Sequence, residues 1–151
     1  DEAKGAVTQE IELEQGLPTS MRLSDDGKLL YVTTITTSGV EVIDVATRKV
    51  VNSFALNTPS TRYRFSGGVA DRTGRYFYIL GARFDKGLDA YRISKPLFMV
   101  VDLEKKEVVR SAELAPEDQK WGYRGTLTLS PDGKTLYAFR DKVVVVNTED
   151  L

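Results

Sequence analysis

An all-β fold made of repeated four-stranded antiparallel units is predicted by three observations on this sequence of 151 residues. A motif is written three times, as LSDDGKLLYVT at 23–33, ADRTGRYFYIL at 70–80 and LSPDGKTLYAF at 129–139. Runs rich in Val, Ile and aromatic residues follow each motif, and such runs have high β-propensity. The whole pattern returns about every 50 residues, which is a period of proteins built from repeated sheets.

Each repeat predicts the same four strands, here labelled a to d in chain order. In the first repeat a short run at 20–24 precedes a turn, and an aromatic run at 29–34 follows it. A third run covers 39–45, and a fourth lies within 46–56 after a second turn. Four antiparallel strands repeated in this way are typical of the blades of a β-propeller. The prediction is a single propeller segment, 1–151, with blades at 17–56, 64–114, and 123–151 together with 1–13.

The turn between strands a and b has the same composition in every repeat. Gly27, Gly74 and Gly133 each follow two polar residues and precede a Lys or Arg. A polar pair followed by Gly predicts a tight hairpin turn in which the glycine adopts a positive φ. The middle repeat departs from the others, because it reads Asp-Arg-Thr-Gly at 71–74.

The beginning of the chain resembles the end of a repeat. Residues 1–13 align without a gap with 44–56 and with 102–114, so we predict a d-type strand over Val7–Leu13. If the chain closes on itself or on a copy, this strand should pair with 142–147. Three blades are too few for a closed ring, since propellers have about four to eight. We therefore expect part of a larger propeller, and the alternative is a symmetric pair of chains.

Composition excludes several classes of function. The 21 basic and 22 acidic residues give a net charge of −1, so neither nucleic acid nor an anionic membrane is expected as a partner. The chain has no Cys and no His, which removes thiolate chemistry and the commonest general base. The apolar runs are too short to span a bilayer, and the initial DEAKGAV is not a signal peptide. We expect no catalytic residue, no metal and no cofactor within this chain.

One rim of the predicted propeller has an unusual composition. The d–a and b–c connections meet there, and they include 58–67, 82–96 and 116–125. These loops are rich in Arg and aromatic residues, which are enriched in the energetically dominant positions of protein interfaces. The alternative is that the aromatic residues pack between blades and the arginines are solvated. The candidate binding residues, with Phe84 beside them, are Arg62, Tyr63, Arg64, Phe65, Arg83, Tyr91, Arg92, Trp121, Tyr123 and Arg124.

The quoted motifs, together with VIDVATRKVV at 42–51, resemble the YVTN-type propeller repeats of bacterial exported and cell-surface proteins. The layout of 54–109 is also similar to the propeller subunit of quinohemoprotein amine dehydrogenases. In that family the propeller is a platform, and other subunits carry the quinone and the haems. The resemblance implies a periplasmic or extracellular protein, although no cofactor-contacting residue can be matched.

These observations together predict a non-catalytic scaffold or binding module that docks another protein or subunit through the rim. The partner is a protein or the remaining blades of the same propeller, and a homodimer is possible. The alternatives are a propeller that binds a small molecule or saccharide, a fragment of a lactonase-like carboxylate–metal hydrolase, and part of a dehydrogenase assembly. A hydrolase of that type needs acidic or amide groups facing the central channel, where the a strands offer Ser20, Gly67 and Thr126.

Overall fold

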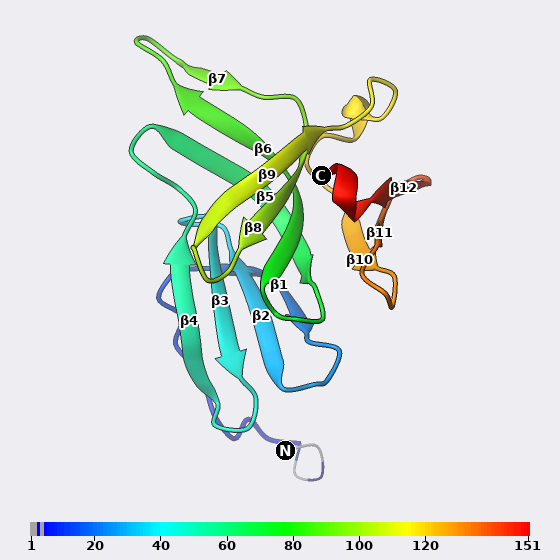
Figure 1. The fold of residues 1–151 in the computed structure, drawn as a ribbon. Helices are drawn as coiled ribbons and strands as arrows, with labels where there is room; N and C mark the ends of the chain where they lie inside the picture. The colour runs from blue at the N-terminus through cyan, green and yellow to red at the C-terminus, as the bar shows by residue number, and fades with distance from the viewer. Residues whose placement is uncertain (1–2, 4) are drawn as a thin grey trace.

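The computed structural model describes residue 3 and residues 5–151, and it contains three antiparallel sheets arranged as an arc (Figure 1). The first sheet has the order β1 (Pro18–Leu23), β2 (Leu29–Thr34), β3 (Gly39–Asp44) and β4 (Lys49–Ala55). The second has the order β5 (Thr61–Ala70), β6 (Tyr76–Lys86), β8 (Leu97–Asp102) and β9 (Glu107–Glu113), with β7 (Tyr91–Ile93) paired to β6. The third has the order β10 (Thr126–Leu129), β11 (Thr135–Phe139) and β12 (Val143–Asn147). Sequential antiparallel order within each sheet confirms the predicted all-β propeller segment.

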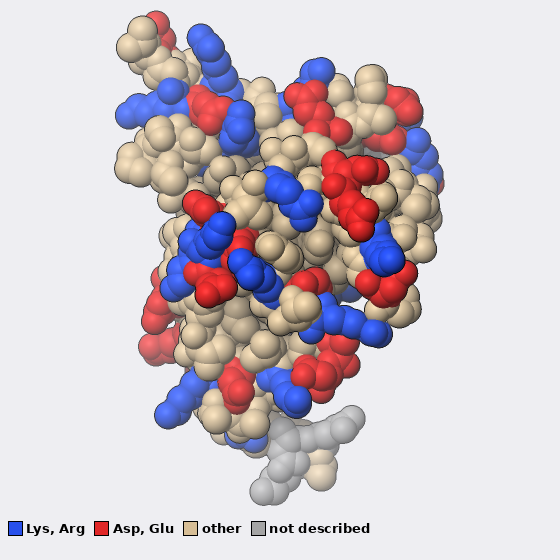
Figure 2. All heavy atoms as spheres, viewed as in Figure 1, with Lys and Arg blue, Asp and Glu red and all other residues tan. Residues whose placement is uncertain are grey.

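Helical structure in the described residues is confined to two short 3-10 turns, η1 (Gln119–Trp121) and η2 (Thr148–Asp150). Neither has the length or the apolar run that crossing a membrane requires. Figure 2 shows Lys and Arg interspersed with Asp and Glu over the viewed face, without a large area of one sign.

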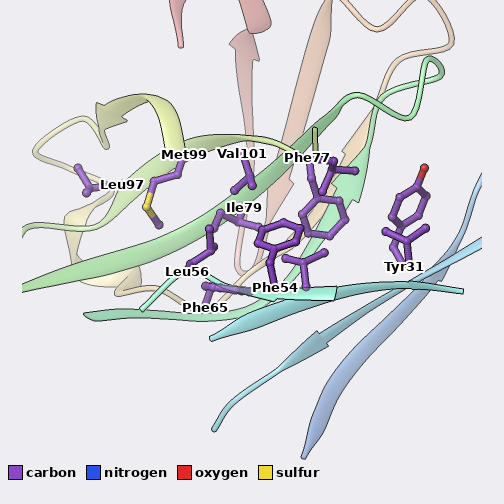
Figure 3. Close-up of a cluster of buried hydrophobic side chains, with 12 residues drawn as sticks. Tyr31, Phe54, Leu56, Phe65, Phe77, Ile79, Leu97, Met99 and Val101 are labelled. Carbon is purple, nitrogen blue, oxygen red and sulfur yellow. The ribbon is translucent and has the colours of Figure 1, made fainter. Parts of the chain in front are cut away.

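The first hydrophobic core lies between the first and second sheets (Figure 3). Tyr31 and Phe54 reach it from the first sheet, and Phe77, Ile79 and Met99 reach it from the second. The rings of Tyr31 and Phe77 are 5.8 Å apart between centroids, a separation usual for aromatic pairs in cores. Face-to-face packing of neighbouring sheets is how propeller blades bury their apolar residues.

A second core lies between the second and third sheets. Leu80, Phe98 and Val100 of the second sheet pack there with Leu127 and Leu136 of the third. Because the second sheet is covered on both faces, all six residues of β8 are buried. This explains why LFMVVD has no alternation of apolar and polar residues.

The three a–b turns have the predicted geometry. The φ angles of Gly27, Gly74 and Gly133 are 71°, 69° and 73°, so the predicted positive φ is confirmed. Each glycine N–H donates to the carbonyl oxygen three residues earlier, at 2.9–3.1 Å.

The unusual middle turn keeps the same hydrogen bonds by exchanging two residue types. In the third repeat the hydroxyl of Ser130 donates to Asp132, whose carboxylate accepts from the N–H of Lys134. In the middle repeat Asp71 occupies the serine position, and it accepts from the Thr73 hydroxyl and from the backbone N–H of Arg75. The departure from the motif therefore changes the order of the hydroxyl and the carboxylate without changing the turn.

The strand predicted over Val7–Leu13 does not form, so this part of the prediction is wrong; residues 1, 2 and 4 of the same alignment lie outside the described residues. The N-terminal segment instead crosses the outer face of the first sheet. The N–H of Gln15 donates to the Glu41 carboxylate at 2.8 Å, and its side-chain amide donates to Ser53 at 3.0 Å. These bonds cover Glu41, which is fully buried in the middle of β3. No strand of the described chain pairs with the free edge of β12.

The sequence led us to expect an irregular loop at 82–96, but this insertion forms regular strands instead. It continues β6 to Lys86 and returns as β7, while β5 begins at Thr61 and follows the same extension. The three strands form an arm that projects from the second sheet, at the upper left of Figure 1. The candidate residues of the middle repeat are therefore held on a sheet, where alternate residues point to opposite faces.

Candidate functional site at the arginine and aromatic rim

The arm divides its candidate residues between two faces. Arg62 is paired with Phe84 and Phe84 with Ile93, and Tyr91 is paired with Lys86 two residues further along β6. Paired residues on antiparallel strands share a face. The face so defined, called here the inner face of the arm, carries Arg62, Arg64, Phe84, Tyr91 and Ile93.

Both arginines of the inner face lie on aromatic rings. The guanidinium carbon of Arg62 is 5.2 Å from the centroid of Tyr91, and that of Arg64 is 5.4 Å from the centroid of Phe84. These distances are within the range of cation–π attraction. The rings hold the two guanidinium groups in place while leaving the N–H groups at their edges available to a ligand.

The opposite face of the arm carries the remaining candidates of this segment. Tyr63 is paired with Arg83, and Asp85 is paired with Arg92. Arg83 forms an ion pair with Asp85, with 3.0 Å between Nε and Oδ2. Tyr63 is half-buried against the first core, and burial raises the pKa of its phenol. Arg83 and Arg92 thus point away from the inner-face arginines, so the structure does not bring all the candidates together.

Two adjoining hollows lie beside the inner face of the arm. Their volumes are about 210 and 230 Å³, and Ile35, Ser38 and Arg64 line both. The other residues of the first hollow are Thr36, Asn57, Arg62, Tyr63, Phe84 and Tyr91. The other residues of the second are Thr19, Phe65, Ser66, Tyr123 and Arg124.

The third repeat contributes to the second hollow. Tyr123 and Arg124 line it just before β10 begins, with Tyr123 half-buried and Arg124 exposed. The backbone of Trp121 lies in η1, but its side chain is outside the described part of the structure. Phe65 is only 6% exposed and packs in the first core, so its main role is structural. The candidate surface therefore consists of Arg62, Arg64, Phe84, Tyr91, Tyr123 and Arg124.

The residue that joins the arm to the first sheet is Ser38, which the sequence analysis missed. Its hydroxyl donates to the carbonyl oxygen of Tyr63, and its φ of 52° is unusual for a residue with a side chain. The amide oxygen of Asn57 accepts from the N–H of Tyr63 at 2.8 Å. Both backbone groups of Tyr63 are thus occupied by side chains. The Ser-Gly pair at 38–39, just before strand c, was the available signal, because such a pair permits unusual backbone angles.

The two hollows are lined by positively charged side chains and not by negatively charged ones. No Asp or Glu is among the described residues that line either hollow. The ion pairs found in the described part of the chain do not involve Arg62, Arg64 or Arg124. Ile35 contributes an apolar surface between the hollows and is 60% exposed. The arrangement can bind an anionic group beside an apolar one.

The described residues contain no group of three or more acidic side chains placed to hold a metal ion. In each a–b turn one carboxylate, that of Asp26, Asp71 or Asp132, accepts from backbone N–H groups of the turn. The carboxylate of Asp25 instead pairs with Arg72 of the next repeat at 3.1 Å. The three arginines of the hollows remain the prominent chemical feature of the rim.

Comparisons with known proteins show the fold alone. Neither the protein-family models nor the curated proteins give a match. The chain is similar to Kuenenia stuttgartiensis hydrazine synthase, with a TM-score of 0.56 and 19% identity, over 97% of this chain and 37% of that one. It is also similar to the WD40 repeats of RRP9, with a TM-score of 0.59 and 12% identity, over 93% of this chain and 38% of that one. A third similar structure is a proposed 6-phosphogluconolactonase from Bacteroides uniformis, with a TM-score of 0.50 and 17% identity, over 91% of this chain and 37% of that one. The chain thus spans well under half the length of each of these three structures.

Proposed function

We propose that this chain is a non-catalytic propeller module that docks another protein through the inner face of the arm and the two hollows beside it. The observation that supports this most is the pair of arginines, Arg62 and Arg64, each held on an aromatic ring and neither joined to a carboxylate in the described structure. Arginine and aromatic residues supply much of the binding energy of protein interfaces. The apolar residues Ile35 and Ile93, exposed at 60% and 66%, add surface that a partner can cover.

The arm that projects beside the hollows favours a protein over a small molecule as the partner. Sites for small ligands usually enclose about 300–1,000 Å³. Each hollow alone is smaller, at about 210 and 230 Å³, but the two adjoin, so their volume does not by itself exclude a small ligand. A protein partner can place single side chains in such hollows and cover the arm as well. A saccharide or lactone, the alternative ligand, would fill the hollows but leave the exposed Ile93 of the arm uncovered.

The test is binding of the natural partner, isolated by affinity capture, to the wild-type chain and to Arg64→Ala and Tyr123→Ala variants. Truncating a buried interface anchor typically costs at least about 2 kcal/mol, which is more than tenfold in affinity. We expect such a loss for Arg64→Ala, with an unchanged thermal melt. Lys49→Ala, at the start of β4 beside the c–d turn of the opposite rim, should bind like the wild type. Equal binding by Arg64→Ala and Lys49→Ala would show that the rim is not the docking surface.

The two ends of the arc support a second set of partners. Met21 and Leu23 are 67% and 53% exposed on the outer face of the first sheet. Val143 and Val145 are 60% and 63% exposed on the outer face of the third sheet, whose edge strand β12 has no further partner in the described chain. Apolar surface on both end faces is what further blades would cover. We therefore propose that the remaining blades of the same propeller, or a second copy of the chain, pack there.

Light scattering on the purified chain separates these arrangements. A discrete dimer that the Val145→Lys substitution dissociates would support pairing of two copies. A monomer that binds further blades of the same propeller, added as a separate chain, would support a longer ring. The YVTN-type and amine-dehydrogenase resemblances further lead us to propose an exported protein that serves as a platform for other subunits. Haem or quinone absorbance in the captured complex would support the dehydrogenase version, and a bound divalent ion would support the hydrolase version.

A further inference from the structure

We propose that the partner segment recognised at the rim is an extended acidic strand that carries carboxylates at alternate residues. This inference rests on the docking function proposed above and names the chemistry of its partner. It follows from the charges that line the hollows, from the spacing of the arginines on β5, and from the way the rings orient them.

The charge balance of the site calls for an anionic partner. Three arginines, Arg62, Arg64 and Arg124, line the hollows together with no carboxylate among the described lining residues. The whole chain is nearly neutral, with 21 basic and 22 acidic residues, so a local excess of this kind is not a consequence of composition. On the opposite face of the same arm Arg83 is neutralised by Asp85 at 3.0 Å. Cations that lie on one face without carboxylates beside them attract a negatively charged surface.

The spacing of the arginines matches an extended peptide. Arg62 and Arg64 are alternate residues of β5, and alternate residues of a strand lie about 6.7 Å apart on the same face. Carboxylates at alternate positions of an extended partner segment have the same spacing and also share one face. Adjacent acidic residues would point to opposite sides, so only one of the two could face the arm.

The orientation of the arginines suits carboxylates. Each guanidinium lies against a ring, Arg62 on Tyr91 and Arg64 on Phe84, so its face is covered. The uncovered edge carries the N–H groups that bind a carboxylate through two parallel hydrogen bonds. Because the rings already restrict these side chains, less conformational entropy is lost when the partner binds. Tyr91 and Phe84 therefore act as positioning residues for the two cations.

The probes for this inference are three synthetic peptides titrated calorimetrically against the folded chain at low ionic strength. Acetyl-AEAEAEA-amide has alternate glutamates, acetyl-AEEAAEA-amide has the same composition with two adjacent glutamates and no two at alternate positions, and acetyl-AQAQAQA-amide has no charge. We expect measurable binding of the alternate peptide, several-fold weaker binding of the adjacent one and at least tenfold weaker binding of the uncharged one. The Arg62→Gln and Arg64→Gln substitutions should each lower the affinity for the alternate peptide at least fivefold.

Arg92→Gln is the matched control, because it removes the same charge from the opposite face of the same arm. The inference is overturned if Arg92→Gln lowers the affinity for the alternate peptide as much as Arg64→Gln does. It is overturned as well if the alternate and adjacent peptides bind with equal affinity. It is also overturned if citrate binds as tightly as the alternate peptide with the same dependence on Arg64, since the site would then be one for small anions. Failure of all peptides while Arg64→Ala still abolishes capture of the natural partner would leave the docking function standing and reject only the acidic strand.

Discussion

The guanidinium of Arg64 lies 5.4 Å from the centroid of the Phe84 ring, so an arginine of β5 rests on an aromatic residue of the neighbouring strand β6. Arg64 lines both hollows, and Phe84 lines the first. The ring and the cation therefore form one unit at the mouth of the proposed docking site. The contribution of the ring to binding can be separated from that of the charge.

Replacing Phe84 by Leu should weaken partner binding while the protein stays folded. Leucine keeps an apolar side chain in the arm but has no ring face, and an exposed cation–π contact is worth about 0.5–1 kcal/mol. The expected loss is therefore about two- to fivefold in affinity, measured by calorimetric titration with the alternate-glutamate peptide. The matched control is Tyr76→Leu, which removes the contact of Tyr76 with Arg75, at 5.4 Å, outside the hollows. If both variants lose affinity to the same extent, the ring of Phe84 has no specific role.

The hydroxyl of Ser38 should stabilise the fold by holding the arm against the first sheet. Ser38→Ala removes the hydrogen bond to the carbonyl oxygen of Tyr63 at a position whose φ is 52°. A buried hydrogen bond contributes about 1 kcal/mol to the free energy of unfolding, so the urea midpoint should fall accordingly. Ser66→Ala, an exposed serine that lines the same second hollow, serves as the comparison and should have almost no effect. Identical urea curves for all three proteins would contradict this role of Ser38.

The repeated turns made most of the fold predictable from the sequence. Glycines at 27, 74 and 133, each between polar residues and a cation, located the a–b hairpins and therefore the strands on either side. The buried strands β3 and β8 could be placed because their β-propensity is high even without alternation. Local chemistry was sufficient here because each turn is stabilised by hydrogen bonds within the turn itself.

Features that depend on contacts between distant segments could not be predicted in the same way. The d-type pattern of 7–13 has the right residues for a strand, but the segment does not join a ladder. The side chain of Gln9 accepts from the Arg48 guanidinium, and Gln15, just beyond the segment, bonds to Glu41 and Ser53. The insertion at 82–96 became a hairpin because β5 lengthens with it, and no turn motif marks that extension. The division of Arg62 and Arg83 between opposite faces of the arm depends on this register, so the sequence predicted the rim but not its two faces.

Gly133→Ala should destabilise the protein through its backbone alone. The φ of Gly133 is 73°, and an added Cβ would meet no atom within 4 Å, so no clash contributes. A non-glycine residue in this conformation costs about 1 kcal/mol or more. Gly133→Asn should lower the stability less, because asparagine tolerates the left-handed region better than alanine. Thermal melts of the three proteins check this order, and an alanine variant as stable as the asparagine variant would show that the turn relaxes to another conformation.

The aspartates of the hairpin turns should make the protein less stable in acid. Asp102 is buried at the end of β8, and the backbone N–H of Lys105, the N–H of Glu104 and the Arg75 guanidinium lower the pKa of its carboxyl. The hydroxyl of Ser24 lowers the pKa of Asp26, and that of Ser130 lowers the pKa of Asp132. A carboxyl whose pKa is lower in the folded state than in the unfolded state stabilises the fold above the unfolded value, which is about 3.9. That contribution is lost as the pH falls from about 4 through the folded pKa values.

We therefore expect the urea midpoint to be nearly constant between pH 6 and 8, because the chain has no His to titrate there, and to fall steeply below about pH 4. Asp102→Asn keeps a side-chain oxygen that can accept from the N–H groups of Glu104 and Lys105 but cannot be ionised. This variant should be less stable than the wild type at pH 7, and the difference should shrink as the pH approaches 3, because the wild-type carboxylate is then protonated. Glu117→Gln, an exposed carboxylate beside η1, is the control and should follow the wild type at every pH. A constant difference between Asp102→Asn and the wild type from pH 7 to 3 would mean that the charge of Asp102 does not stabilise the fold.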